Sequence, residues 1–177
     1  MKRWGKIVAG IVISCFLVCQ NGFAAQSENW QGVILQEEYS KLLPEEIKES
    51  KNQKIDVRGK YIASSGLSIT NEGYGVLEVY ADTLAHVAVK KIKMTIYLDQ
   101  WNEDREDWTQ IDSKSLTYEY EEGGPILNEA SQSFLVENLQ TNKYYRLRGL
   151  HAVWSFDGYM ESQSTMTDGV LLTDGPA

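Results

Sequence analysis

The sequence is poor in cysteine and histidine. Its two cysteines, Cys15 and Cys19, both lie near the amino terminus of a chain of 177 residues. The remainder of the chain therefore has no disulfide framework, thiolate nucleophile or cysteine-ligated metal. The two histidines, His86 and His151, leave few candidates for a metal site or a general base. A folded domain of this composition must be stabilised by packing.

Residues 1–25 have the order of a secretory signal peptide. Lys2, Arg3 and Lys6 precede an apolar stretch over residues 7–18. Small residues follow, which predicts cleavage after Ala24 or Ala25. The apolar stretch is about a dozen residues, whereas a spanning helix needs roughly 20. We therefore expect an exported mature chain with no transmembrane span after cleavage.

A lipoprotein is the alternative interpretation of this segment. Residues 12–15, Val-Ile-Ser-Cys, resemble a lipobox that ends at Cys15. The apolar stretch continues past Cys15 to residue 18, whereas a lipidated cysteine is normally followed by a polar tether. The pattern therefore favours the cleaved signal peptide, and lipidation at Cys15 remains the minor alternative.

The mature chain is acidic. Removing residues 1–25 takes away three basic residues and no acidic one, so the formal net charge goes from −8 to −11. Such a chain repels nucleic-acid phosphates, and the charge mainly keeps an exported protein soluble. About 150 residues correspond to one domain with a hydrophobic core of its own.

The segment before residue 55 reads as peripheral. Residues 42–46, Leu-Leu-Pro-Glu-Glu, predict the start of a short helix. Proline is favoured in the first turn of a helix, and acidic residues are favoured near its amino-terminal end, where the helix dipole is positive. Residues 48–54 are nearly all polar and read as a linker. We therefore divide the chain into a signal peptide (1–25), a peripheral segment with a linker (26–54) and a folded domain (55–173).

From residue 55 onward the hydrophobic pattern has a period of two, which indicates half-buried strands. Residues 91–98 alternate strictly between apolar and polar. The other expected strands are residues 57–64, 75–81, 108–112, 116–121, 133–137, 144–153 and 159–164. Turn residues separate them, as at Asp157-Gly158. About seven to eight such strands predict an all-β fold, an antiparallel, immunoglobulin-like β-sandwich, with a small β-barrel as the alternative.

Residues 139–148 support the sandwich. They resemble the start of strand F in immunoglobulin-like and fibronectin type III domains, where a tyrosine hydroxyl folds back onto the preceding corner. Tyr145, six residues after Leu139, has the matching position. The proline that usually follows the leucine in fibronectin type III domains is absent. This resemblance implies that residues 91–98 and 144–153 are strands C and F, neighbours in one sheet.

The region from Arg58 to Val170 resembles an uncharacterised family of small secreted proteins from Gram-positive bacteria. The resemblance is carried by Arg58-Gly59, by residues 144–151 with the pattern Tyr-Tyr-Arg-x-Arg-Gly-x-His, and by Thr167-Asp168-Gly169. The family is a domain of unknown function. Membership implies export and a β-rich fold, and it implies no activity.

Signs of catalysis or of a metal site are weak. His151 has the strand parity of Tyr145 and Leu147, which predicts an inward, hydrogen-bonded, half-buried imidazole rather than a catalytic base. No Gly-x-Ser-x-Gly nucleophile motif is present. Five carboxylates crowd one hairpin and suggest weak calcium binding, but they lack the order of a calcium loop, which favours a solvated acidic loop; they are Asp99, Glu103, Asp104, Glu106 and Asp107. We therefore assign no catalytic residue, metal or cofactor.

A basic and aromatic face is the candidate binding site. If strands C and F are neighbours, their outward side chains form one surface that could receive an anionic or sugar ligand. The expected ligand-binding residues are Lys91, Lys93, Tyr97, Tyr144, Arg146, Arg148, Trp154, Phe156 and Tyr159. The alternative, which we favour, is a ladder of cross-strand ion pairs, for example between Arg146 or Arg148 and Glu161.

The sequence thus predicts a secreted, non-catalytic β-sandwich protein that serves as a binding or cell-surface-associated accessory module. A glycan or a protein of the cell surface is the expected partner, and nucleic acid is not. Two alternatives remain open. One is a secreted hydrolase that uses carboxylates with His151, and the other is a structural subunit of the cell surface.

Overall fold

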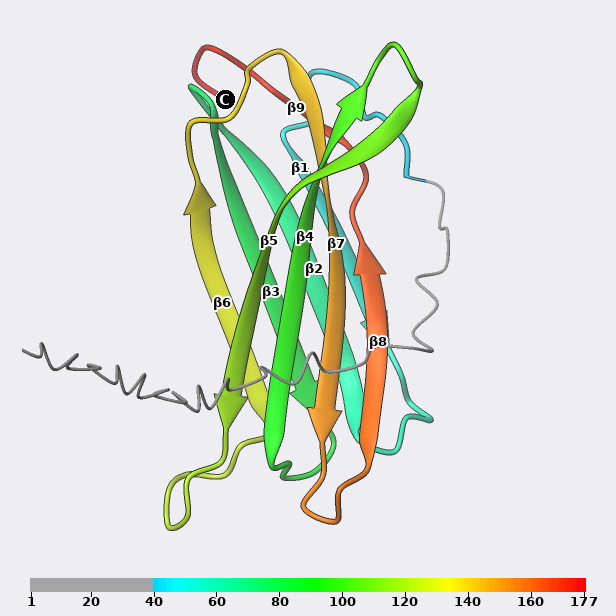
Figure 1. Ribbon diagram of the computed structural model, residues 1–177, viewed down its shortest axis with the longest axis vertical. Coiled ribbons are helices and arrows are strands. Elements are labelled where there is room, and N and C mark those ends of the chain that lie inside the picture. The colour runs from blue at the N-terminus through cyan, green and yellow to red at the C-terminus, as the bar shows by residue number, and fades with distance from the viewer. Residues whose placement is uncertain (1–39) are drawn as a thin grey trace, which may run out of the picture. The chain divides into compact units, whose positions relative to one another are not determined.

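The computed structural model describes residues 40–177, which form two antiparallel sheets packed face to face (Figure 1). The predictions for residues 1–25 and for residues 26–39 concern residues outside the described part of the chain. The strands are β1 (Glu49–Ile55), β2 (Ile62–Gly73), β3 (Val76–Ala85), β4 (Lys91–Asn102), β5 (Asp107–Glu119), β6 (Glu129–Val136), β7 (Lys143–Trp154), β8 (Met160–Met166) and β9 (Val170–Leu172).

The strand order defines a β-sandwich. One sheet has four strands in the order β1-β2-β3-β6, and the other has the order β5-β4-β7-β8, with β9 paired to β7. Every pair of these strands is antiparallel, as in β4 with β7 (Met94 beside His151). The sheets do not close into a barrel, so the sandwich prediction is confirmed and the barrel alternative is wrong. The expected pairing of residues 91–98 with residues 144–153 is also confirmed.

The core lies between the sheets and follows the alternation of the sequence. In β4, Ile92 and Met94 are completely buried, and in β7 so are Leu147 and Val153. They pack against inward side chains of the four-stranded sheet, among them Val79. Burial of these apolar side chains is the main force that holds the cysteine-free domain together. Among residues 40–177 no helix is long and apolar enough to cross a membrane.

Tyr145 forms the predicted tyrosine corner. Its side chain is completely buried, and its hydroxyl donates a hydrogen bond to the backbone oxygen of Gln140 at 2.9 Å. The same hydroxyl accepts a hydrogen bond from Gln100 Nε2 at 2.9 Å, which ties β4 to the start of β7. Burial raises the pKa of Tyr145, so the hydroxyl stays protonated and able to donate.

Two predictions for the segment before residue 55 are wrong. Residues 42–46 do not begin a helix. They contain a single turn, in which the Ile47 amide donates to the Pro44 oxygen at 2.9 Å. Residues 48–54 are not a linker, because β1 pairs residue by residue with β2. β1 is polar because it is an edge strand with one face in solvent, which resembles a linker in composition.

Two strand boundaries also differ from the sequence pattern. Residues 57–61 form a loop, in which Asp56 Oδ1 accepts hydrogen bonds from the amides of Arg58 and Gly59 at 3.0 and 2.7 Å. Residues 108–112 and 116–121 belong largely to a single strand, β5. A register shift opposite Leu98 and Asp99 places an additional residue, Ile111, in β5. This bulge changes the parity of the strand, so the alternation in the sequence is interrupted at Ile111.

Candidate functional site

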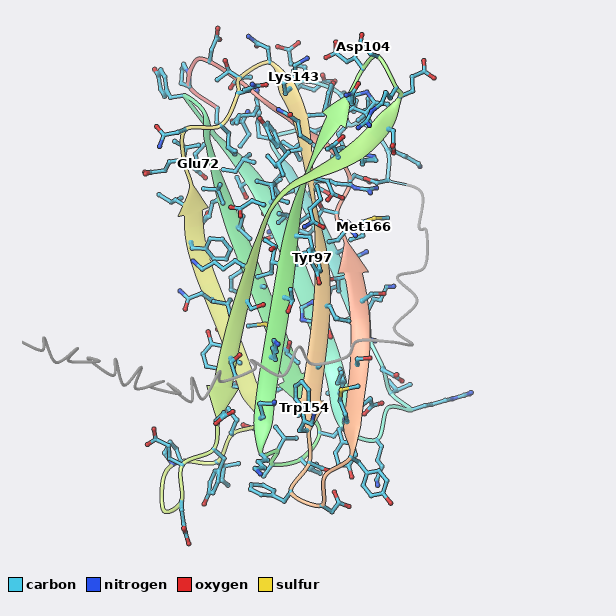
Figure 2. All side chains as sticks on the ribbon, in the orientation of Figure 1. Glu72, Tyr97, Asp104, Lys143, Trp154 and Met166 are labelled. Atoms are coloured by element: carbon cyan, nitrogen blue, oxygen red, sulfur yellow. The ribbon has the colours of Figure 1, made fainter. Side chains whose placement is uncertain are left out.

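The predicted ligand-binding residues lie along the outer side of β4 and β7 and in the loop after β7, where they form two groups. Near the middle of the sheet, Tyr97 is beside Arg148. At the end of the sheet where β4 begins, Lys91 is beside Trp154. Figure 2 shows Tyr97 near the centre of the sheet and Trp154 toward one end. The structure therefore brings the predicted residues onto one surface, but it does not gather them into one pocket.

The group near the centre is organised by Asp99, a residue that the sequence analysis assigned to a loop. Asp99 is in β4, and its carboxylate is completely buried. Arg148 donates to it twice, from Nε to Oδ2 at 2.7 Å and from Nη2 to Oδ1 at 2.9 Å. Arg146 donates from Nε to Oδ2 at 3.0 Å. Two guanidinium groups thus share one carboxylate, in a bidentate and charge-assisted geometry.

Aromatic rings cover this ion cluster. The Arg146 guanidinium carbon lies 4.6 Å from the centroid of the Trp108 ring, and that of Arg148 lies 5.2 Å from the Tyr97 ring. The Arg146 and Arg148 side chains are only 14% and 21% exposed. Burial lowers the pKa of Arg146, and the hydrogen bond with Asp99 opposes that effect. The two guanidinium groups are therefore held by the Asp99 carboxylate and by the aromatic rings, and the carboxylate offsets one of their two positive charges.

The cross-strand partner of the two arginines is thus Asp99, and the predicted pairing with Glu161 is wrong. Glu161 instead accepts hydrogen bonds from the backbone amides of Tyr61 and Ile62, at 2.5 and 3.0 Å. These bonds attach β8 to the loop that leads into β2. The arginines do form cross-strand ion pairs, as the favoured alternative to a ligand site predicted, but their acidic partner is Asp99 and not Glu161.

The second group of predicted residues lies at the end of the sheet where β4 begins. The Lys91 ammonium is 3.9 Å from the Trp154 ring centroid, and Lys60 is 4.7 Å from that of Tyr159. Phe156 contacts Tyr120 edge to face. A hollow of about 280 Å³ lies beside Lys91 and Trp154. The aromatic rings in this group thus already have cationic or aromatic neighbours within the chain.

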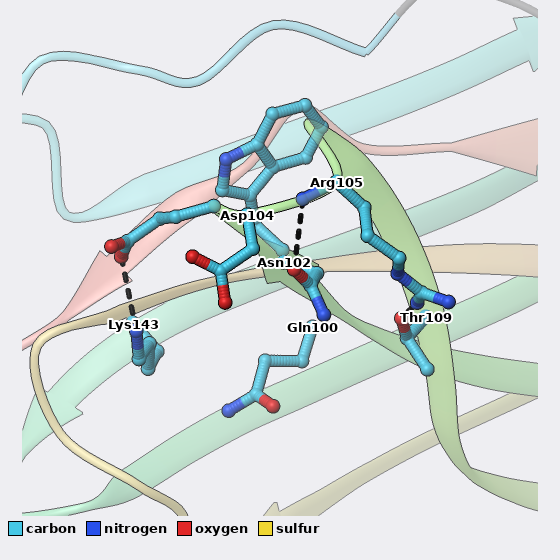
Figure 3. A pocket seen from close by; sticks show the side chains of 8 residues that line it. Gln100, Asn102, Asp104, Arg105, Thr109 and Lys143 are labelled. Atoms are coloured by element: carbon cyan, nitrogen blue, oxygen red, sulfur yellow. Dashed lines mark hydrogen bonds and ion pairs between the residues drawn. The ribbon is translucent and has the colours of Figure 1, made fainter.

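A larger hollow of about 610 Å³ lies at the opposite end, at the hairpin between β4 and β5 (Figure 3). It is lined by Gln100, Trp101, Asn102, Glu103, Asp104, Arg105, Thr109 and Lys143. Lys143 bridges from β7 to Glu103 at 3.0 Å, and the Arg105 amide donates to Asn102 Oδ1 at 3.1 Å. Arg105 also donates a short hydrogen bond to Thr109. We call this hollow the hairpin pocket.

The carboxylates of the hairpin point in different directions. Asp99 faces the arginines, Glu103 binds Lys143, and Asp107 Oδ1 accepts a hydrogen bond from the Trp108 amide at 2.7 Å. Within residues 40–177 no group of three histidine, cysteine or acidic side chains is arranged to hold a metal ion. Asp104 lines the hairpin pocket and makes no hydrogen bond or ion pair within that part of the chain.

Sequence reasoning missed the residues that build this end of the sheet. Trp101 and Trp108 form an edge-to-face pair with ring centroids 5.2 Å apart. Gly169 lies so close to the Trp108 ring that a Cβ at this glycine would be 2.7 Å from a ring carbon. The sequence did contain a signal for them, because Tyr97, Asp99 and Trp101 continue the alternation of outward side chains in β4. The signal was overlooked because the expected strand ended at Leu98, whereas β4 extends to Asn102.

His151 lies between the sheets, as its parity predicted, and it is completely buried rather than half-buried. Its Nδ1 is 2.8 Å from Thr83 Oγ1, and its Nε2 is 2.9 Å from Thr165 Oγ1. Burial lowers the pKa of His151 to about 4. Gly149 makes room for this contact, since a Cβ at that position would lie 2.9 Å from His151 Nε2. The imidazole is neutral, and neither nitrogen faces a carboxylate or solvent.

Comparison with known proteins assigns the chain to a family. The model of a family of unknown function, DUF6147, matches residues 45–169. Because this match covers most of the chain, the protein belongs to that family. A search of the curated proteins gives no match. The match agrees with the expectation of an uncharacterised domain family, and it brings no activity with it.

Proposed function

We propose that the protein is an exported, non-catalytic binding module with an immunoglobulin-like fold, which attaches to a glycan or protein of the cell surface of a Gram-positive bacterium. The strand order supports the fold assignment. If β4 and β7 are strands C and F, then β8 has the position of strand G, and β3 and β6 have those of strands B and E in the facing sheet. The signal peptide pattern supports export.

The hairpin pocket carries this proposal. It combines an indole ring (Trp101), two amides (Gln100 and Asn102), a cation (Lys143) and a carboxylate without a partner in the described chain (Asp104). Aromatic surface together with a few polar groups is the usual composition of a site for a polar ligand. The ion cluster of Asp99, Arg146 and Arg148 lies next to the pocket and links β4 to β7, two strands that supply pocket residues.

The burial of His151 argues against a hydrolase. A general base must come within hydrogen-bond distance of the proton that it removes, and His151 is completely enclosed by β-sheet residues. Its two partners are threonines. The hydrolase that the sequence left open therefore lacks its proposed base, and the binding module is the better account.

The proposal is tested by sedimentation with cell walls. Protein purified from the culture medium is mixed with cell walls of the producing bacterium, and the bound fraction is measured. We expect the double variant Asp104→Asn, Lys143→Ala to bind about tenfold more weakly, because both residues line the hairpin pocket. The matched control is Glu106→Gln, Lys90→Ala, which makes the same charge changes outside the pocket. Equal binding by all three proteins would refute the pocket as the site.

A further inference from the structure

A second hollow lies on the other sheet, on its outer face. It has a volume of about 580 Å³ and runs over β2, between β1 and β3. Its lining comes from these three strands and from Ser133 of β6. We call this hollow the β2 groove.

The depth of the groove results from a difference in side-chain size between neighbouring strands. The residues of β2 that line its floor, Gly66, Ser68 and Thr70, are small. The registered neighbours on β3, Asp82 and Tyr80, are larger and form one wall. From Gly66 to Thr70 the floor extends for about 14 Å at the usual rise of a strand. An extended ligand can therefore lie along β2.

Asp82 is a hydrogen-bond acceptor that reaches from the β3 wall over the floor of the groove. Its carboxylate lies directly over Gly66, where a Cβ would come within 2.0 Å of Asp82 Oδ1. Within residues 40–177 no group donates a hydrogen bond to this carboxylate or forms an ion pair with it. Burial raises the pKa of Asp82. A partly buried carboxylate without a donor is destabilising unless a ligand or water supplies one.

The remaining groups of the groove suit a polyhydroxylated ligand. Tyr80 is 41% exposed and presents a ring beside Asp82. Gln53 of β1 adds an amide on the other side, and Ser68 adds a hydroxyl at the floor. The rim formed by β3 and β6 is already held by a hydrogen bond, since Ser133 Oγ donates to Glu78 Oε1 at 2.6 Å. An aromatic face with acceptors and donors around it is the combination that stacks on a sugar ring and bonds its hydroxyls.

The charge of the groove lining favours a neutral oligosaccharide over an anionic one. The groove contains Glu49, Glu78 and Asp82 against one cation, Lys51, and Lys51 is paired with Glu49 at 2.7 Å. An anionic polymer would be repelled by the excess of carboxylates. We infer that the β2 groove binds a neutral oligosaccharide chain that lies along β2, with Tyr80 stacking on a sugar ring and Asp82 accepting hydrogen bonds from its hydroxyls.

This site is separate from the hairpin pocket, because it lies on the opposite sheet and shares no residue with it. Its test is calorimetric titration of the secreted protein with four neutral hexasaccharides: cellohexaose, xylohexaose, mannohexaose and chitohexaose. We expect at least one to bind. Tyr80→Ala and Asp82→Asn should each weaken that binding about tenfold, while the Asp104→Asn, Lys143→Ala variant should bind it as the native protein does.

The matched controls are Tyr74→Ala and Asp112→Asn, which make the same changes at exposed positions outside the groove. They should bind the oligosaccharide as the native protein does. Circular dichroism confirms that each variant is folded before it is titrated. The inference is overturned if none of the four hexasaccharides binds, or if the groove and control variants bind equally. Binding of oligolysine that Asp82→Asn abolishes, without sugar binding, would show a site for a cationic peptide instead and would also overturn it.

Discussion

Asp99 and Arg148 form a bidentate ion pair on a sheet face, with the carboxylate completely buried and Arg148 Nε and Nη2 at 2.7 and 2.9 Å from its two oxygens. Arg146 shares the same carboxylate. The single carboxylate thus holds two arginines of β7 beside β4.

We therefore predict that Asp99→Asn destabilises the domain. The substitution keeps the size of the side chain but leaves two poorly solvated guanidinium groups without a counterion. The expected loss is about 3 kcal/mol in the free energy of unfolding, measured by urea denaturation. Asp112→Asn, at an exposed position of the neighbouring strand, should change it by less than about 0.5 kcal/mol. A similar small effect at both positions would show that Asp99 is not the counterion that matters.

The second prediction concerns the pH dependence of stability. In the folded protein the pKa of His151 is about 4, below its ordinary value of 6.5. Between these values the unfolded chain binds a proton that the folded protein excludes, so the free energy of unfolding decreases as the pH falls from 6.5 to about 4. The full loss from this residue is about 3 kcal/mol, and it is absent above pH 6.5.

Urea unfolding at a series of pH values measures this effect. Carboxylates also titrate in this range, so the native protein is compared with His151→Gln, whose amide can still bond the two threonines. The variant should lack the additional loss of stability between pH 6.5 and 4. Parallel curves for the two proteins would mean that His151 takes up its proton equally well in both states.

The third prediction tests the tyrosine corner. Tyr145→Phe removes the donor to the Gln140 oxygen and the acceptor for Gln100. Both partners lose a hydrogen bond at a largely buried corner, so the free energy of unfolding should decrease by about 1–2 kcal/mol. Tyr144→Phe, one residue earlier and partly exposed, is the control and should be close to neutral. Equal effects of the two substitutions would argue against a stabilising corner.

The fourth prediction concerns export. Intact-mass measurement of the secreted protein should give a chain that begins at Ala25 or Gln26, without a lipid. A mature chain that begins at a lipidated Cys15 would instead establish the lipoprotein and give the module a membrane tether.

Period-two alternation identified most of the sandwich in advance, because strands with one wet face leave a clear pattern in the sequence. Residues 91–98 and 144–153 were placed correctly as neighbours, and Tyr145 was placed at the corner. β1 was missed because a polar edge strand has the composition of a linker. The bulge at Ile111 concealed the continuity of β5, since it shifts the parity of the side chains.

The sites were less predictable than the fold. The outward parity of Arg146 and Arg148 was correct, but their partner lies in β4, beyond the residue at which the sequence pattern ended that strand. Asp99 had been assigned to a loop, and Glu161 was expected to pair with the arginines. The β2 groove was not foreseen, because its depth comes from the difference in size between β2 and its two neighbours. Such a difference becomes visible only when the register is known.

Chemical-shift mapping tests the central claim, that the hairpin pocket is the attachment site, most directly. The ¹⁵N-labelled mature protein is titrated with solubilised cell-wall fragments of the producing bacterium, and the amide and indole N–H signals are followed. We predict that the largest changes occur at Trp101, Asn102 and Lys143. Shifts confined to surfaces away from the hairpin, or no shifts at saturating concentrations of fragments, would contradict the account.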